Sequence, residues 1–162
     1  MSRNTRLPAL GRRGEGWVLG QLLLIAAVLL SALVGRRWTG GSAVAAFTVG
    51  GVLIALGLRM LLWAARHLGA SLTPFPAPRA EHGVKTTGPY AFVRHPIYGA
   101  LILFALGWTI VFATVAGLVA TVALALLLDL KSRREEAWLR ERVDGYEDYY
   151  RRTPRRFVPF VY

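Results

Sequence analysis

The sequence predicts an all-α, polytopic membrane protein with about four transmembrane helices arranged as two hairpins. Its 162 residues are 54% hydrophobic, and the mean hydropathy is +0.42. The net charge is +11, yet several stretches of bilayer length carry almost no charge. Basic flanks beside long apolar runs are typical of integral membrane proteins. Nucleic-acid binding, another common property of basic proteins, is not predicted, because so small a soluble fold cannot hide an apolar segment of bilayer length.

The first two predicted spans are residues 17–35 and 42–65. The first has nineteen residues without a charge, which is longer than the apolar core of a signal peptide, so we expect a retained helix. The second contains Arg59 near its end, where a long side chain can reach the interface. Only the glycine-rich GRRWTGG lies between them, so residues 1–65 are expected to form an N-terminal antiparallel hairpin.

Residues 66–95 are predicted to form an ordered loop. Prolines, glycines and scattered charges interrupt any helical pattern there. A connection of this length is uncommon unless it has a function.

The next 33 residues, 96–128, carry no charge. A single helix of that length would measure about 50 Å, which exceeds the roughly 30 Å of the bilayer core. We therefore expect two helices, 97–112 and 115–130, with a turn at residues 113–114. The fourth helix is expected to continue into water as a charged helical tail, so that residues 66–162 form the core of a single domain, 1–162.

The distribution of Lys and Arg predicts the orientation in the membrane. With four spans, the N-terminus, the 66–95 loop and the C-terminal tail share one side, which holds eighteen of the twenty cations. The positive-inside rule places this side in the cytosol. We therefore expect an inner- or plasma-membrane protein with both termini cytosolic. Arg36 and Arg37 are the exceptions.

Arg94, His95 and Pro96 stand at the start of the third predicted helix. Proline is common at the first helical position, and it keeps the preceding residue out of helical geometry, so His95 should be held extended. The free N–H groups of such a helix start favour an anionic group. The alternative is an ordinary interfacial Arg and His. Tyr98 and Gly99 follow, and a glycine here allows either a ligand or another helix to approach the backbone.

Glu135 and Glu136 are adjacent on the fourth helix, so their side chains should point in different directions. Either both belong to a solvated face paired with neighbouring arginines, or one is buried and faces a cationic ligand. Tyr146 and Tyr149 in the tail fit an interfacial segment or the cap of a cofactor pocket.

Three segments occur together: GPYAFVRHPIYGA, then EEAWL, then GYEDYYRRTPRRFVP. Their order and spacing resemble the isoprenylcysteine carboxyl methyltransferase and phospholipid N-methyltransferase superfamily, over residues 66–160. Members are small membrane enzymes that use S-adenosylmethionine and lack the soluble Rossmann fold; no strand followed by GxGxxG occurs here. The resemblance implies a cofactor site made by Tyr90, Arg94, His95, Pro96, Tyr98, Gly99, Glu135, Glu136, Tyr146 and Tyr149.

The resemblance further implies methyl transfer to a lipophilic or small acceptor at the membrane interface, through a carboxylate, amine or thiol. A Glu would hold the cofactor ammonium and Arg94 or helix N–H groups its carboxylate. No catalytic residue is assigned, and His95 is expected to bind cofactor rather than act as a base. The alternatives are an NADPH-dependent, sterol-reductase-like membrane enzyme and a non-catalytic scaffold that retains the fold.

The expected partners are the acceptor and membrane lipids, with no obligate protein partner and no nucleic acid. The sequence has no cysteine. Its three histidines, His67, His82 and His95, are not spaced as metal ligands, so no metal is predicted.

Overall fold

A computed structural model describes residues 7–8, 10–36, 38–75 and 83–157. Within these residues the chain is helical and contains no strand, which confirms the predicted all-α class. The α-helices are α1 (Glu15–Leu30), α2 (Gly40–Leu68), α3 (Pro96–Val111), α4 (Val115–Arg142) and α5 (Tyr146–Arg152). Short 3₁₀ turns are η1 (Ser31–Val34), η2 (Gly69–Ser71) and η3 (Gly88–Ala91).

Three helical segments are long and apolar enough to cross a membrane: α1 together with η1, then α2, then α4. Helix α3 is apolar but has only 16 residues. The helix boundaries agree closely with those expected from the sequence. Helix α2, for example, ends three residues after the expected end of the second span. As expected, α4 continues without a break from its apolar half into the charged residues of the tail. The chain is therefore an integral membrane protein by its helix lengths and composition.

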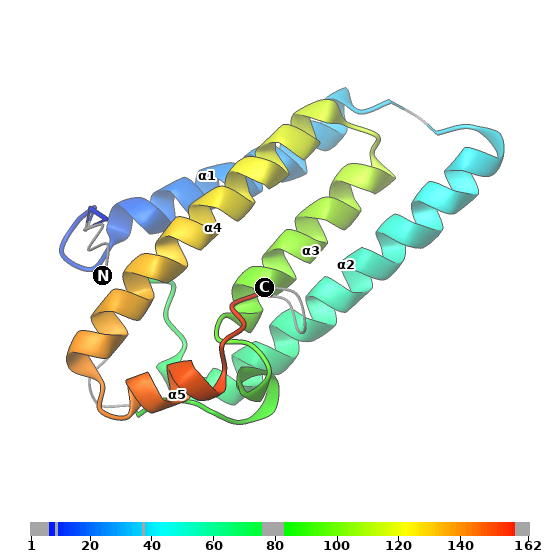
Figure 1. Cartoon of the computed structure of the whole chain (residues 1–162). Helices are drawn as coiled ribbons and strands as arrows, with labels where there is room; N and C mark the ends of the chain where they lie inside the picture. Colours follow the sequence, from blue (N-terminus) through cyan, green and yellow to red (C-terminus); the bar gives the residue numbers. More distant parts are fainter. Residues whose placement is uncertain (1–6, 9, 37, 76–82, 158–162) are drawn as a thin grey trace.

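The packing order differs from the expected hairpin of the first two helices. Helix α3 packs against α2 and also against α4, whereas α1 packs mainly against α4 (Figure 1). Helices α1 and α2 are not packed together as a hairpin. A short linker constrains how far apart two helix ends can be, but side-chain packing decides which helices touch.

The contact between α2 and α3 depends on small residues. A Cβ atom added to Gly107 would lie 2.6 Å from the carbonyl oxygen of Gly50, and one added to Gly50 would lie 2.8 Å from that of Gly107. The two backbones therefore cross at a distance that only glycine allows. Such close crossings are a common way for helices to associate in lipid, where burial of apolar surface gives no advantage over contact with lipid tails. This contact explains why α2 pairs with α3.

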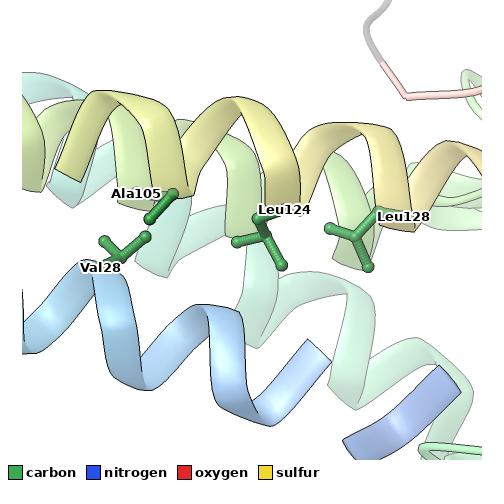
Figure 2. Close-up of a cluster of buried hydrophobic side chains, with 5 residues drawn as sticks. Val28, Ala105, Leu124 and Leu128 are labelled. Atoms are coloured by element: carbon green, nitrogen blue, oxygen red, sulfur yellow. The ribbon is translucent and has the colours of Figure 1, made fainter. Parts of the chain in front are cut away.

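A cluster of buried apolar side chains joins α1, α3 and α4. It consists of Val28, Ala105, Ala120, Leu124 and Leu128. Figure 2 shows Val28 on α1 below Ala105, Leu124 and Leu128. The cluster fixes the middle of the helical bundle.

Helices α3 and α4 form the predicted hairpin. Its turn lies at residues 113–114, as expected, with Ala113 in a left-handed conformation at φ 48°. The Thr114 hydroxyl then caps α4 by accepting a hydrogen bond from the Gly117 N–H at 3.3 Å. At the opposite end of the bundle, α5, the chain between α2 and α3, and the start of α3 come together (Figure 1). We call this the α5 end.

Candidate functional site

A cavity of about 450 Å³ lies at the α5 end. All five helices or the segments between them contribute to its wall. Its volume is in the range of small-molecule and cofactor sites. Eight of the ten predicted site residues line it: Tyr90, Arg94, His95, Pro96, Tyr98, Glu135, Tyr146 and Tyr149. The other two, Gly99 and Glu136, lie outside this lining.

The start of α3 is built as the sequence indicates. Pro96 occupies the first turn, and His95 has φ −127° and ψ 63°, outside helical geometry. The backbone N–H groups of Arg94 and His95 donate to the carbonyl oxygens of Arg155 at 3.0 Å and Arg156 at 2.9 Å. The C-terminal segment 153–157 is thereby fixed along this corner, behind the cavity wall.

Gly99 serves the same arrangement. A Cβ atom at this position would lie 2.5 Å from the backbone oxygen of Phe157. The absence of a side chain therefore lets the C-terminal segment pass directly over the first turn of α3. The expected close approach is therefore made by a non-helical segment of the chain and not by another helix.

Glu136 is the centre of a buried ion cluster. Its Oε1 accepts a hydrogen bond from Arg94 Nε at 2.8 Å and lies 3.0 Å from His95 Nε2. Its Oε2 is 3.4 Å from Nη2 of Arg156, whose Nη1 donates to Asp129 at 2.6 Å. Arg94 and Glu136 are each only 5% exposed. Charges this deeply buried need such partners, so the cluster ties α4, the start of α3 and the C-terminal segment together.

Arg94 has further contacts on the same side. Its Nη1 donates to the carbonyl oxygen of Thr153 at 2.7 Å, and its guanidinium carbon lies 4.3 Å from the ring centroid of Tyr150. The planar guanidinium is therefore held by hydrogen bonds in its plane and by an aromatic face across it. Its position is fixed before any ligand arrives.

Glu135 points elsewhere, toward the cavity. Its Oε2 accepts a hydrogen bond from the Tyr98 hydroxyl at 2.8 Å, and its side chain is 25% exposed. The Tyr98 ring in turn stacks on His95, with 5.3 Å between centroids and 2° between planes. The two adjacent carboxylates diverge as the sequence predicted. Glu136 belongs to the buried cluster, whereas Glu135 lines the cavity, where its Oε2 also lies 3.8 Å from His95 Nδ1.

Three tyrosines complete the wall on the side of α5 and η3. The Tyr149 hydroxyl donates to the carbonyl oxygen of Tyr90 at 2.8 Å, and the Tyr146 and Tyr149 rings meet edge to face. Burial raises the pKa of Tyr90, Tyr146 and Tyr149 above the ordinary tyrosine value. Their hydroxyls therefore stay neutral at physiological pH and act as hydrogen-bond donors.

Sequence reasoning missed several residues that build this end. Arg156 and Thr153 lie in an arginine-rich tail, and the sequence of this tail does not indicate which side chain is buried. Lys131 also lines the cavity, and here a signal existed, because it precedes Glu135 by four residues and so shares its helix face. Gln21 from α1 reaches the same wall.

In the part of the chain that the structure describes, no three His, Asp or Glu side chains are grouped as metal ligands. His82 lies outside the described residues. His67 contacts Trp63 instead, with its Nδ1 2.9 Å from the Trp63 carbonyl oxygen.

Comparison with known proteins gives two matches. A family model described as "Phospholipid methyltransferase" matches residues 45–143, which cover most of α2 and all of α3 and α4. The chain is also 29% identical, over 138 residues, to the cobalt-zinc-cadmium resistance protein CzcN of Cupriavidus metallidurans. That alignment covers 83% of this chain and 60% of CzcN, so the chain spans less than two thirds of that relative.

Proposed function

Because the chain belongs to the phospholipid methyltransferase family, we propose that it is an S-adenosylmethionine-dependent membrane methyltransferase whose cofactor binds in the cavity at the α5 end. The observation that supports this most directly is the Glu135 carboxylate, which lines a ligand-sized cavity, accepts a hydrogen bond from the neutral Tyr98 and lies 3.8 Å from His95 Nδ1. A carboxylate so placed can accept a cationic ligand group.

The donor set of the cavity fits this cofactor. S-adenosylmethionine carries an ammonium, a carboxylate and a positively charged sulfonium. We propose that Glu135 binds the ammonium and that Arg94 binds the carboxylate, because the N–H groups of Tyr98 and Gly99 at the start of α3 already donate to the His95 carbonyl oxygen. Neutral aromatic rings from Tyr90, Tyr146 and Tyr149 suit a cationic sulfur, because a cation is attracted to the face of an aromatic ring.

Bound there, the cofactor would supply an electrophilic methyl group. The chain itself would contribute position and charge complementarity, which are the main needs of an in-line displacement. In this proposal Glu136 does not touch the ligand. It holds Arg94 and His95 in place, while Tyr98 orients Glu135.

The acceptor is proposed to be lipophilic or small, with a carboxylate, amine or thiol as the receiving group. Apolar side chains support this, since they form much of the cavity wall: Leu61, Leu68, Leu72, Ile97 and Leu101. An acceptor dissolved in the bilayer could enter between helices. The cofactor would arrive from the cytosol, because eighteen of the twenty cations lie before residue 17, between residues 59 and 94, or after residue 130, and the positive-inside rule predicts a cytosolic side for these segments.

Calorimetric titration of the detergent-purified protein with S-adenosylmethionine, S-adenosylhomocysteine and NADPH tests this function. We expect both adenosyl ligands to bind and NADPH not to bind. Binding of NADPH alone would favour the reductase-like alternative. A protein that binds none of the three at millimolar concentration would contradict the proposal.

The site assignment is tested by Glu135→Gln, with Glu141→Gln as the matched control on the exposed face of the same helix. Loss of one charge-assisted hydrogen bond should weaken S-adenosylmethionine binding about tenfold to a hundredfold. The control should bind as the unaltered protein does. Equal affinities for both variants would show that Glu135 is not the ammonium site.

A further inference from the structure

Lys131 is a second charged group in the cavity, and the proposed cofactor contacts do not use it. It lies on α4, four residues before Glu135 and three after Leu128 of the buried apolar cluster. The lysine therefore lies about one helical turn deeper in the bundle than Glu135. Only 1% of its surface is exposed, and it lines the cavity.

The two hydrogen-bond partners of Lys131 are both neutral. Its Nζ donates to Gln21 Oε1 at 2.6 Å and to the carbonyl oxygen of Pro74 at 2.9 Å. An ammonium has three donors, so one N–H remains for a further acceptor. Among the described residues, no ion pair joins it to a carboxylate. The Glu135 carboxylate, one helical turn away, attracts the ammonium but does not form an ion pair with it. Burial of a charge is costly, and an anion that enters the cavity would offset more of that cost.

Tyr98 separates this lysine from the proposed ammonium site. The hydroxyl of Tyr98 donates to Glu135, while Nζ of Lys131 lies 5.2 Å from the centroid of the Tyr98 ring. The cavity thus has a carboxylate nearer the α5 end and a cation deeper in the bundle. Leucines from α2 and α3, Leu61 and Leu101, line the same cavity. A deep cation among apolar walls is complementary to an amphipathic anion.

We propose that Lys131 binds the anionic receiving group of the acceptor, a carboxylate or a thiolate on an apolar chain, and selects it over an amine. This inference rests on the proposed function, because it places the cofactor at the other end of the cavity. An alkylammonium acceptor would meet a like charge at Lys131, and like charges in a buried site repel strongly.

The chemical step balances without a base. A lone pair on the acceptor O⁻ or S⁻ forms a bond to the methyl carbon of S-adenosylmethionine. The bond from that carbon to sulfur breaks, and its electron pair stays on sulfur. The products are a methyl ester or a methyl thioether and neutral S-adenosylhomocysteine, and no proton is transferred. An alkylammonium acceptor, or a thiol that arrives protonated, would first have to lose a proton.

Three probes with the same chain and different head groups test the inference: dodecanoate, dodecanethiol and dodecylamine. Their binding to the full-length protein in detergent is measured by calorimetry with S-adenosylhomocysteine present, and their methylation by transfer of labelled methyl from S-adenosylmethionine. We expect the acid or the thiol to bind and be methylated, and the amine to do neither. Equal or preferred use of the amine would overturn the inference, as would failure of both the acid and the thiol.

Lys131→Met and Lys131→Arg separate charge from shape. Methionine removes the cation from a buried position with similar length, and we expect about tenfold to a hundredfold weaker binding of the anionic probe, with S-adenosylmethionine binding unchanged. Arginine keeps the charge and should keep the preference for the anion. Retained preference in Lys131→Met would overturn the inference. If Lys131→Met does not fold, loss of the preference for the anionic probe in Lys131→Arg would overturn the inference.

The two proposals fail in different ways. If the unaltered protein binds no adenosyl ligand, the proposed function is wrong and the role of Lys131 falls with it. If the cofactor binds but the head-group preference is absent or reversed, only the role of Lys131 is wrong.

Discussion

Replacement of Glu136 by alanine should destabilise the folded protein strongly, even without ligand. Its carboxylate lies 2.8 Å from Arg94 Nε and 3.0 Å from His95 Nε2, and Arg156 approaches from the C-terminal segment. The substitution would leave the Arg94 guanidinium buried beside Arg156 without their shared counter-charge. Removal of one partner from a buried ion pair typically costs about 3–5 kcal/mol. That is a large part of the stability of an ordinary domain.

The assay is reversible unfolding of the purified protein in mixed micelles with increasing dodecyl sulfate, followed by circular dichroism. Glu141→Ala is the matched control, because Glu141 lies on the same helix and is exposed. An exposed substitution of this kind should change the free energy of unfolding by no more than about 0.5 kcal/mol. If Glu136→Ala costs no more than this control, the ion cluster does not hold the site together and the reasoning is refuted.

A double-mutant cycle with Arg94→Met isolates the contact. If the two charges stabilise each other, Arg94→Met should cost much less in the Glu136→Ala background than in the unaltered protein. Coupling energies between residues in direct contact are about 0.5–3 kcal/mol, and this pair should lie near the upper end because both groups are buried. Additive effects would mean that Glu136 acts through other partners.

Two further variants test the packing around the cavity. Gly99→Ala should lower the free energy of unfolding by about 1–3 kcal/mol, because the new Cβ would lie 2.5 Å from the Phe157 backbone oxygen. The control Gly51→Ala, in a helix with open space beside it, should be neutral or stabilising. Equal effects of the two variants in the same unfolding assay would contradict the packing argument. Tyr149→Phe removes the hydrogen bond to the buried Tyr90 carbonyl and should cost about 1–3 kcal/mol, while retained full stability would show that the hydroxyl is dispensable.

The helices were largely predictable from the sequence because their signals are local. Uncharged runs of bilayer length define α1 and α2, and the excessive length of the third apolar run requires a turn. Its position at residues 113–114 agrees with the structure, where Thr114 caps the next helix. Local composition decides where a helix begins and ends, so one sequence is sufficient for this part.

The pairing of helices was less predictable. The short linker suggested that α1 and α2 would pack together, but α2 pairs with α3 through Gly50 and Gly107. Each glycine is unremarkable in a sequence with seventeen of them. Only the crossing of two backbones reveals which glycines are needed for contact.

The candidate site was predictable where the residues form a dense motif. Tyr90, the residues from Arg94 to Tyr98 and the carboxylate Glu135 all line one cavity. Arg156 was not predictable, because it is one of four arginines in the RRTPRR segment and only the fold turns it toward Asp129 and Glu136.

The different surroundings of Glu135 and Glu136 follow from helix geometry. Consecutive residues on a helix point about 100° apart, so a cavity on one side of α4 can reach only one of the pair. The other carboxylate must then be satisfied by a different part of the chain, and here the C-terminal segment meets that need through Arg156. The same segment fixes Arg94 through the Thr153 carbonyl and passes over Gly99. The cavity wall and the chain behind it therefore form one structural unit, in which the buried charges hold in place the groups that face a ligand.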